Sequence, residues 1–388
     1  MEDTKQILTR NVLEIINSQS LEKKLNSGKK LNVKLGVDPT SSDLHIGHAV
    51  SLWKLKEFQD AGHKAIFLIG DYTARVGDPS GRSKARKILS EEDIQKNTES
   101  WLEQAGKILD LDSCEVRYNS EWYSKMSFTD ILDLFGKVSL ANVTEREDFK
   151  KRLSRGSEVG FVEAIYPVMQ GYDSVELKAD VELGGYDQRL NLLMGRDLQK
   201  KMDQAPQDIL TMPLLMGTDG KKMSKSEGNY IGLNDAPEQM YGKIMSISDE
   251  LIEQYLDLAT NYSDDEIEIM KNAIKDGENP KTIKEKIAVR IVEMYHGEVE
   301  AQKAAEHFEH VVRGKQVPDK IEEKKIESKN IIDVLVEVDF ASSKSDARRL
   351  IEQKGVRVNG EVVDIEFEFK KEAVLQVGKL KHLKIMLS

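Results

Sequence analysis

Two histidines, His45 and His48, stand where the sequence changes from a strand pattern to a helix pattern. The first backbone N–H groups of a helix and its dipole attract phosphate. Two imidazoles at that place add hydrogen-bond donors that can follow charge developing on a phosphorus atom. Gly47 between them leaves room for a flat base against the backbone. A histidine in a loop is often only a surface or capping residue, so this motif alone suggests a nucleotide site without establishing it.

A second motif, Lys222-Met223-Ser224-Lys225-Ser226, follows far downstream. The turn residues Thr218-Asp219-Gly220 before it and Gly228 after it predict a mobile loop over residues 218–228. Two lysines on such a loop can close over a triphosphate and neutralise the leaving pyrophosphate, which needs positioning and charge but no covalent nucleophile. A basic surface loop is the alternative for this motif alone. Together the two motifs predict a site that binds ATP and activates a substrate by nucleotidyl transfer.

The elements that must carry these motifs are the strands and helices of a parallel sheet. Residues 30–38 alternate apolar and polar side chains, which predicts a strand whose polar face includes Lys34. A helix is expected to begin at Gly47, and the apolar run 64–69 predicts a strand buried on both faces. Strand and helix patterns alternate through about residue 215, which is typical of a parallel α/β fold.

Three polar residues, Tyr166, Gln170 and Asp173, are spaced i, i+4 and i+7 and therefore share one face of a predicted helix. The residues between them are mostly apolar, so this polar stripe needs partners. A bound substrate would supply them. A solvated surface stripe is the alternative that the spacing leaves open.

These motifs resemble the paired signatures of class I aminoacyl-tRNA synthetases. The surrounding residues are similar to the bacterial tyrosyl-tRNA synthetases of that class, in the same order and over almost the whole chain. The shorter matching strings are Gly36-Val37-Asp38-Pro39-Thr40, Gly77-Asp78-Pro79-Ser80-Gly81, Tyr166 to Asp173 and Gly184-Gly185-Tyr186-Asp187-Gln188. The resemblance implies a Rossmann-like α/β catalytic domain that activates L-tyrosine with ATP and transfers it through tyrosyl-adenylate to tRNA(Tyr).

The resemblance also implies roles for individual residues. The expected catalytic residues are His45, His48, Lys222, Lys225, Thr40, Arg82 and Arg86, the two arginines on a second basic segment for which an exposed loop is the alternative. The expected ATP contacts are Asp38, Gly47, His45, His48, Gly185, Asp187 at the ribose, and Lys222, Met223, Ser224, Lys225 and Ser226. The expected tyrosine contacts are Tyr166, Gln170 and Asp78 at the ammonium, Asp173 at the phenol, and Gly36, Leu68, Thr73 and Gln188. Magnesium is expected to arrive with ATP, without a metal site or a tightly bound prosthetic group in the protein.

One position departs from the family pattern. Many family members have a tyrosine two residues before the glycine at Gly36, where it helps contact the substrate hydroxyl, whereas this chain has Lys34. The residue that makes the second contact to the phenol is therefore not identified by the family pattern, and Lys34 is one candidate.

The remaining chain is expected to form further domains after the catalytic domain, residues 1–230. An insertion at about 122–160 is implied to support a homodimer, with Phe161 at the interface unless it is a core phenylalanine. Residues 231–317 are expected to form an α-helical domain that binds the anticodon arm, residues 318–329 a charged linker, and residues 330–388 a small α+β S4-like RNA-binding domain. Its expected RNA-binding residues are Lys344, Arg348, Arg349, Lys354 and Arg357, for which a solvated basic helix face is the alternative.

Composition sets limits on partners and location. The formal net charge of −11 argues against non-specific binding of nucleic acid over the whole surface, and no DNA partner is expected. The single cysteine, Cys114, excludes an internal disulfide framework and fits a reducing compartment. No apolar run reaches the ~18 residues of a membrane span, so a cytoplasmic protein without membrane contact is expected.

Three other functions stay open from the sequence. A tryptophan-specific relative would share the architecture without an obvious need for the polar stripe at Tyr166, Gln170 and Asp173. A small-molecule nucleotidylyltransferase could share the histidine motif, although the RNA-binding tail argues against it. A non-enzymatic RNA-binding regulator could keep that tail, although both nucleotide motifs are intact.

Overall fold

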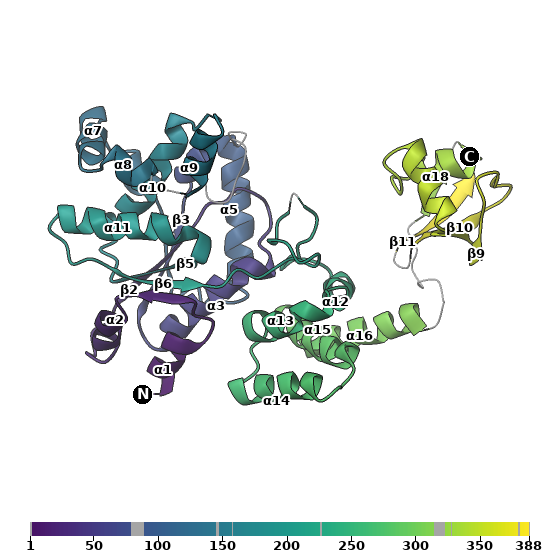
Figure 1. Cartoon of the computed structure of the whole chain (residues 1–388), viewed down its shortest axis with the longest axis horizontal. Coiled ribbons are helices and arrows are strands. Elements are labelled where there is room, and N and C mark those ends of the chain that lie inside the picture. The colour runs from purple at the N-terminus through teal and green to yellow at the C-terminus, as the bar shows by residue number, and fades with distance from the viewer. Residues whose placement is uncertain are drawn as a thin grey trace. The chain divides into compact units, whose positions relative to one another are not determined.

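The computed structural model describes residues 2–78, 89–144, 147–156, 158–225, 227–313, 323–326, 328–378 and 381–387. The chain forms two compact units, Met1–Gln302 and Lys303–Ser388, and Figure 1 shows the whole chain. The predicted division at residue 230 does not coincide with this boundary and stays a prediction. Among the described residues, no helix has both the length and the apolar character needed to cross a bilayer.

The first unit is built on a six-stranded sheet with the order β1-β6-β5-β2-β3-β4. Neighbouring strands are parallel except β1 and β6, which pair antiparallel at one edge. The strands are β1 (Glu14–Ile16), β2 (Asn32–Val37), β3 (Lys64–Ile69), β4 (Glu115–Tyr118), β5 (Val181–Gly185) and β6 (Asp208–Met212). The predicted parallel α/β fold is therefore confirmed.

The order of the strands creates a switch point in the middle of the sheet. From β2 the chain adds β3 and β4 on one side, and it later adds β5 and β6 on the other side. Connections leave β2 and β5 in opposite directions, so a crevice opens beyond their carboxyl ends. Ligands of open α/β sheets bind in such crevices.

Helices cover both faces of the sheet. In chain order they are α1 (Glu2–Thr9), α2 (Ser18–Leu25), α3 (Ile46–Asp60), α4 (Thr73–Val76), α5 (Glu91–Ala105), α6 (Ser120–Tyr123), α7 (Phe128–Gly136), α8 (Leu140–Thr144), α9 (Glu147–Ser154), α10 (Phe161–Glu176), η1 (Tyr186–Gln188) and α11 (Arg189–Lys201). Helices α7 to α11 share a buried apolar cluster that includes Phe149, Val168 and Leu198. The predicted insertion thus consists of short helices that pack on α10 and α11, as Figure 1 shows.

The predicted strand at residues 30–38 is β2, and Lys34 on its polar face is buried as well. Lys34 lies on the opposite face of the strand from Val33 and Leu35, as the alternation predicts. That face is also covered by helices, however, so Lys34 is completely buried and forms an ion pair with Glu182 of β5. Alternation alone does not distinguish a solvated face from a buried face whose polar residues have partners.

The first unit continues with further helices. They are α12 (Pro237–Met245), η2 (Asp249–Leu251), α13 (Ile252–Ala259), α14 (Asp264–Lys275), α15 (Pro280–His296) and the start of α16 (Glu298–Arg313). Pro237 opens α12, and Asn279 caps α15 by accepting a hydrogen bond from Lys281 N. The Trp53 indole of α3 donates to the Tyr295 hydroxyl of α15 over 3.2 Å, which ties these helices to the sheet domain.

The second unit contains a five-stranded sheet with the order β7-β11-β10-β8-β9 and its own apolar core. Its elements after α16 are β7 (Glu323–Ile326), α17 (Ile331–Glu337), α18 (Lys344–Glu352), β8 (Val356–Val358), β9 (Glu361–Val362), β10 (Ala373–Val377) and β11 (Lys381–Leu387). The turn at Asn359-Gly360 joins β8 and β9 as an antiparallel hairpin, as an Asn-Gly pair between apolar runs favours. The linker prediction is wrong for Glu323–Ile326, because this charged segment pairs with β11 and buries Ile326.

Candidate active site

A pocket of about 1190 Å³ lies at the switch point, beyond the carboxyl ends of β2 and β5. Every described residue of the predicted catalytic, ATP and tyrosine sets lines it. These are Gly36, Asp38, Thr40, His45, Gly47, His48, Leu68, Thr73, Asp78, Tyr166, Gln170, Asp173, Gly185, Asp187, Gln188, Lys222, Met223, Ser224 and Lys225. Arg82, Arg86 and Ser226 lie outside the described residues. The fold therefore brings together motifs that are up to 189 residues apart in sequence, from Gly36 to Lys225.

The histidine motif forms the first turn of α3. His45 is the N-cap residue in an extended conformation, and its backbone N–H donates to His48 Nδ1 over 3.2 Å. The two rings stack with their centroids 3.7 Å apart. Because Nδ1 of His48 accepts a hydrogen bond, its proton lies on Nε2 when the ring is neutral. The motif thus presents an ordered N–H donor at a helix N-terminus.

Both imidazoles are neutral at physiological pH. Burial, and then the positive charge of Lys222, lowers the pKa of His48 to about 4. Burial, followed by the charges of His48, Lys222 and Lys225, lowers the pKa of His45 to about 2. These side chains can therefore stabilise a transition state as hydrogen-bond donors but not as fixed cations.

Gly47 lies closely against the His45 ring. A Cβ atom at residue 47 would lie 3.0 Å from His45 Nδ1 and 3.6 Å from Met223 Sδ. The first distance is shorter than most Cβ contacts, whereas the second is ordinary van der Waals contact, so a side chain here would press mainly on the His45 ring. The structure thus gives Gly47 a reason beyond the predicted room for a base.

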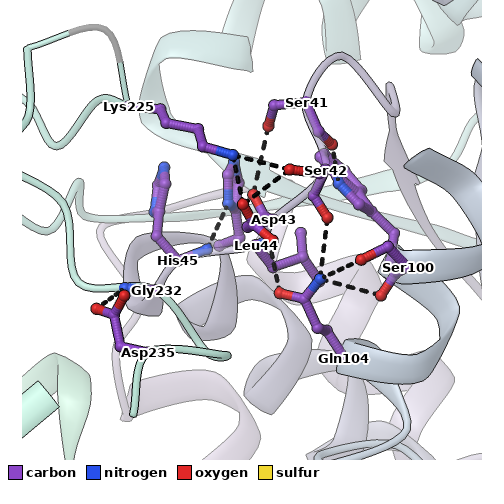
Figure 2. A network of polar contacts seen from close by, with 12 residues as sticks. Ser41, Ser42, Asp43, Leu44, His45, Ser100, Gln104, Lys225, Gly232 and Asp235 are labelled. Carbon is purple, nitrogen blue, oxygen red and sulfur yellow. Dashed lines mark hydrogen bonds and ion pairs between the residues drawn. The ribbon is translucent and has the colours of Figure 1, made fainter. Parts of the chain in front are cut away.

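Side chains of α5 hold the loop that leads into the histidines, as Figure 2 shows. Gln104 Oε1 accepts a hydrogen bond from Leu44 N over 2.8 Å, and its Nε2 donates to Ser42 O over 3.1 Å. Gln104 is completely buried. The Trp101 indole donates to Ser41 O over 2.5 Å. Sequence reasoning missed these two residues, because nothing in a helix some 60 residues downstream marks a partner of this loop.

The lysine loop is anchored at its base by Asn229. Asn229 Oδ1 accepts from Ser224 N over 2.8 Å, and Nδ2 donates to Asp219 Oδ1 over 2.7 Å. Lys222 forms an ion pair with Asp187 over 2.7 Å, and Lys225 forms one with Asp43, as Figure 2 shows for the second pair. The carboxylates of Asp187, which lines the pocket, and of Asp43 thus hold the two lysines where an anion would compete for them.

The other end of the pocket gathers polar groups around Asp38. The Tyr166 hydroxyl donates to Asp38 Oδ2 over 2.9 Å, and the Thr73 hydroxyl donates to Asp38 Oδ1 over 2.8 Å. At Gly70 a Cβ atom would lie 2.1 Å from Asp38 Oδ1 and 2.2 Å from the Thr73 hydroxyl. Only glycine fits there, and no sequence signal marks Gly70, because the contact joins two strand ends.

A cluster suited to an ammonium group lies beside this site. Gln170 Oε1 is buried and accepts no hydrogen bond from the described residues. Asp78 Oδ2 accepts from Gln188 Nε2 over 2.7 Å. The Tyr166 hydroxyl oxygen, which donates to Asp38, keeps lone pairs as an acceptor. A buried acceptor without a donor is costly, so a ligand with N–H donors would stabilise this arrangement.

Asp173 lies on the buried side of the pocket and accepts from two side chains. Trp122 Nε1 donates to Oδ1 over 3.0 Å, and Asn119 Nδ2 donates to Oδ2 over 3.4 Å. Burial raises the pKa of Asp173 to about 7, although Lys34, Asn119 and Trp122 each favour the ionised form. The alternative of a solvated surface stripe is therefore wrong for Asp173. Sequence reasoning missed Asn119 and Trp122, which come from the end of β4 and from α6.

The residues predicted to lie at the dimer interface and to bind RNA are exposed. Phe161 is 74% exposed, so the alternative of a core phenylalanine is wrong. Other large apolar side chains of the same helical region are exposed as well, namely Phe128, Leu132, Leu140, Leu153 and Val162. In the second unit, the basic residues Lys344, Arg348, Arg349, Lys354 and Arg357 are all exposed.

Comparisons with known proteins identify the family. The family described as tRNA synthetases class I (W and Y) matches residues 26–313. The chain is a class I tRNA synthetase. A second match, to the S4 domain, covers residues 331–375 of this synthetase. The predicted S4-like module is therefore confirmed as a domain, and its RNA contacts stay a prediction.

Relatives of this synthetase cover it along its whole length. It is 48% identical to the tyrosine–tRNA ligase of Thermotoga maritima over 99% of this chain and 97% of that protein. It is 46% identical to the tyrosine–tRNA ligase of Idiomarina loihiensis over 98% of this chain and 97% of that protein. These identities place the synthetase in the family of bacterial tyrosine–tRNA ligases.

Solved structures share the fold of this synthetase. A C-terminally truncated mitochondrial tyrosyl-tRNA synthetase of Coccidioides posadasii is 26% identical and superposes with a TM-score of 0.63, over 79% of this chain and 90% of that chain. A tyrosyl-tRNA synthetase of Archaeoglobus fulgidus complexed with L-tyrosine is 23% identical, with a TM-score of 0.63 over 78% of this chain and 99% of that chain. The second likeness shows the fold alone.

Proposed function

We propose that the protein is a tyrosine–tRNA ligase that uses ATP to activate L-tyrosine and then charges tRNA(Tyr). The observation that carries this proposal is a single pocket with two chemically different ends. One end offers neutral imidazoles, a helix N-terminus and two lysines to a triphosphate. The other end offers a buried acceptor at Gln170 and a buried carboxylate, Asp173. The names of the full-length relatives support tyrosine as the amino acid.

The first step joins tyrosine to AMP. A carboxylate oxygen of tyrosine attacks the α-phosphorus of ATP, and the bond to the bridging oxygen breaks to release pyrophosphate. His45 and His48 donate hydrogen bonds to the phosphate oxygens as charge develops, and Lys222 and Lys225 exchange their carboxylate partners for the leaving pyrophosphate. Asp38, Thr40, Gly185 and Asp187 line the path of the nucleotide.

The second step transfers the amino acid. A ribose hydroxyl of the terminal adenosine of tRNA attacks the carbonyl carbon of the adenylate, and AMP leaves. No residue of the protein forms a covalent bond in either step. Tyr166, Gln170 and Asp78 hold the ammonium group, Asp173 accepts the phenol hydrogen bond, and Gly36, Leu68, Thr73 and Gln188 surround the ring and backbone of the substrate.

Further parts of the proposal concern cofactors and assembly. Magnesium enters with ATP and balances phosphate charge. The exposed apolar side chains around Phe161 support a homodimer formed through the insertion helices. Because its tRNA substrate is cytoplasmic, the enzyme acts in the cytoplasm.

ATP–pyrophosphate exchange with each of the twenty amino acids, without tRNA, tests the proposed activity. Exchange with tyrosine alone is expected. Exchange with tryptophan would keep the fold and overturn the substrate. No exchange with any amino acid would favour an RNA-binding regulator, and exchange with a non-amino-acid acid would favour a small-molecule nucleotidylyltransferase.

Replacement of Gln104 by methionine is expected to slow adenylate formation about tenfold with little change in tyrosine affinity, since the loop before His45 loses two hydrogen bonds outside the tyrosine site. Single-turnover formation of tyrosyl-adenylate measures the rate. Gln95→Met, on the exposed side of the same helix, is the matched control. An equal loss of tyrosine affinity would show a general disturbance of the pocket.

Replacement of both Arg348 and Arg349 by alanine is expected to weaken tRNA binding and to reduce its salt dependence by about one unit of slope for each phosphate that the variant no longer neutralises. Both side chains are exposed on α18. Filter binding of tRNA(Tyr) at several salt concentrations measures the slope. Alanine at Lys370 and Lys371, exposed elsewhere in the same unit, is the charge-matched control, and an equal effect of both pairs would argue against RNA binding by α18.

A further inference from the structure

Lys34 forms part of the pocket floor without being accessible to solvent. Its Nζ lies 2.8 Å from Glu182 Oε1 of β5. It donates to the Ser174 hydroxyl over 2.9 Å and to Gln170 O over 3.1 Å, both on α10. An ammonium group has three N–H donors, so two of them serve these hydrogen bonds while Glu182 compensates the charge. Lys34 is thereby committed to the protein and not to a ligand.

The ion pair belongs to a larger buried network. Glu182 Oε2 accepts from the Ser174 hydroxyl over 3.0 Å and from the side-chain amide of Gln207. Gln207 Nε2 also donates to Leu192 O of α11 over 3.2 Å. Ser174, Glu182 and Gln207 are each at most 1% exposed. A buried polar network of this kind fixes geometry more than it adds stability, because desolvation offsets the attraction of its charges.

The two contacts of Lys34 on α10 span one helical turn. Gln170 and Ser174 are four residues apart, and Asp173 lies between them. Gln170 and Asp173 both line the pocket, whereas Ser174 faces the network. A side chain from β2 therefore holds, from behind, the turn that presents two expected substrate contacts.

We propose that Lys34, together with Glu182, is a positioning residue for the amino acid pocket, which sets where Gln170 and Asp173 meet the substrate. This inference rests on the proposed function, because it assigns Lys34 to tyrosine recognition. It also accounts for the lysine at a position where a tyrosine would contact the phenol directly. The recognition of the phenol then depends on Asp173, and the placement of Asp173 depends on Lys34.

The charges around Asp173 give this role a measurable signature. The groups that face its carboxylate are Lys34 of β2, Glu182 of β5, Asn119 after β4, Trp122 and Tyr123 of α6, and Tyr166 of α10. The charge of Lys34 lowers the pKa of Asp173, and the charge of Glu182 raises it. Loss of Lys34 alone therefore raises the pH at which Asp173 becomes an ionised acceptor.

Two variants test the proposal by ATP–pyrophosphate exchange across pH. Lys34→Met is expected to raise the KM for tyrosine about tenfold, with an unchanged KM for ATP, because a displaced helical turn misplaces the amino acid and not the nucleotide. In the pH profile of kcat/KM for tyrosine, the inflexion is expected to move to higher pH. The double variant K34M/E182Q removes both charges, so the inflexion is expected to return towards its original pH while the KM for tyrosine stays raised.

Lys24→Met is the matched control. Lys24 also pairs with a buried carboxylate of the sheet, Asp208, over 2.9 Å, but it does not line the pocket. It is expected to leave the KM for tyrosine and the inflexion unchanged. If Lys24→Met changed both the KM for tyrosine and the pH of the inflexion as Lys34→Met does, the proposal would be overturned.

A merely structural role for Lys34 would give a different pattern. The KM values for tyrosine and ATP would then change together, and the inflexion would not move. If Lys34→Met failed to fold, the double variant K34M/E182Q would carry the test alone. The proposal would be overturned if this variant kept both the wild-type KM for tyrosine and the wild-type preference for tyrosine over phenylalanine. Failure of the wild-type enzyme to exchange with tyrosine would instead refute the proposed function.

Discussion

Replacement of Asp173 by alanine is expected to raise the KM for tyrosine about 30-fold or more, since a hydrogen bond to a charged group contributes about 2–3 kcal/mol. The same change is expected to weaken the exclusion of phenylalanine by a similar factor. In the wild-type pocket, phenylalanine leaves the Asp173 carboxylate without its phenol partner. In the variant that penalty disappears. ATP–pyrophosphate exchange with tyrosine and with phenylalanine measures both effects.

Glu176→Ala is the control for this prediction. Glu176 is an acid one turn further along α10, and it is exposed and outside the pocket. It is expected to leave tyrosine KM and the exclusion of phenylalanine unchanged. Unchanged values for both parameters in Asp173→Ala would remove Asp173 from the substrate pocket.

The pH dependence of the wild-type enzyme gives the same prediction a second readout. The pKa of Asp173 is raised to about 7, so the free enzyme carries a protonated Asp173 at lower pH and an ionised acceptor at higher pH. We therefore expect kcat/KM for tyrosine to rise as pH increases through about 7. The histidines of the pocket do not titrate there, because burial lowers their pKa values far below this range. This inflexion should be absent from Asp173→Ala.

The sequence predicts the elements of the sheet domain well where a local signal exists. The apolar run 64–69 forms β3, and the cap at Ser90 opens α5 by accepting from Asp93 N. Both depend on interactions within a few residues. Helix α5 ends at Ala105, and the chain continues in turns.

The pocket is predictable only as far as its motifs are. His45, Lys222 and their neighbours carry recognisable chemistry and spacing, and the fold brings them together as expected. Gln104, Gly70 and Asn119 carry none, because their roles arise from contacts between elements that are distant in sequence. The residues that hold a site in place are thus harder to predict than those that face its ligand.

Lys34 illustrates the same limit at a single position. In the sequence it is a polar residue of a strand and a candidate for direct contact with the phenol. The buried carboxylate that determines its role, Glu182, is 148 residues downstream on the neighbouring strand. Strand order decides that the two meet, and no periodicity within either strand encodes this order.

Replacement of His45 by alanine is expected to reduce the rate of tyrosyl-adenylate formation about 100- to 1000-fold, the usual cost of losing one donor to a charged transition state. The dissociation constant for tyrosine should change less than about twofold, because His45 lies at the nucleotide end of the pocket. Its Nδ1 is buried and has no hydrogen-bond partner among the described residues, and its ring stacks on His48. Single-turnover kinetics and equilibrium tyrosine binding measure the two quantities separately.

His63→Ala provides the matched control for this last prediction. His63 is also partly buried in the first unit, but it accepts from Leu31 N at the amino ends of β2 and β3 and does not line the pocket. It is expected to leave the rate of adenylate formation unchanged. Equal losses of rate and of tyrosine affinity in His45→Ala would contradict a role in the transition state, because a donor that acts only on developing phosphate charge contributes nothing to the binding of tyrosine.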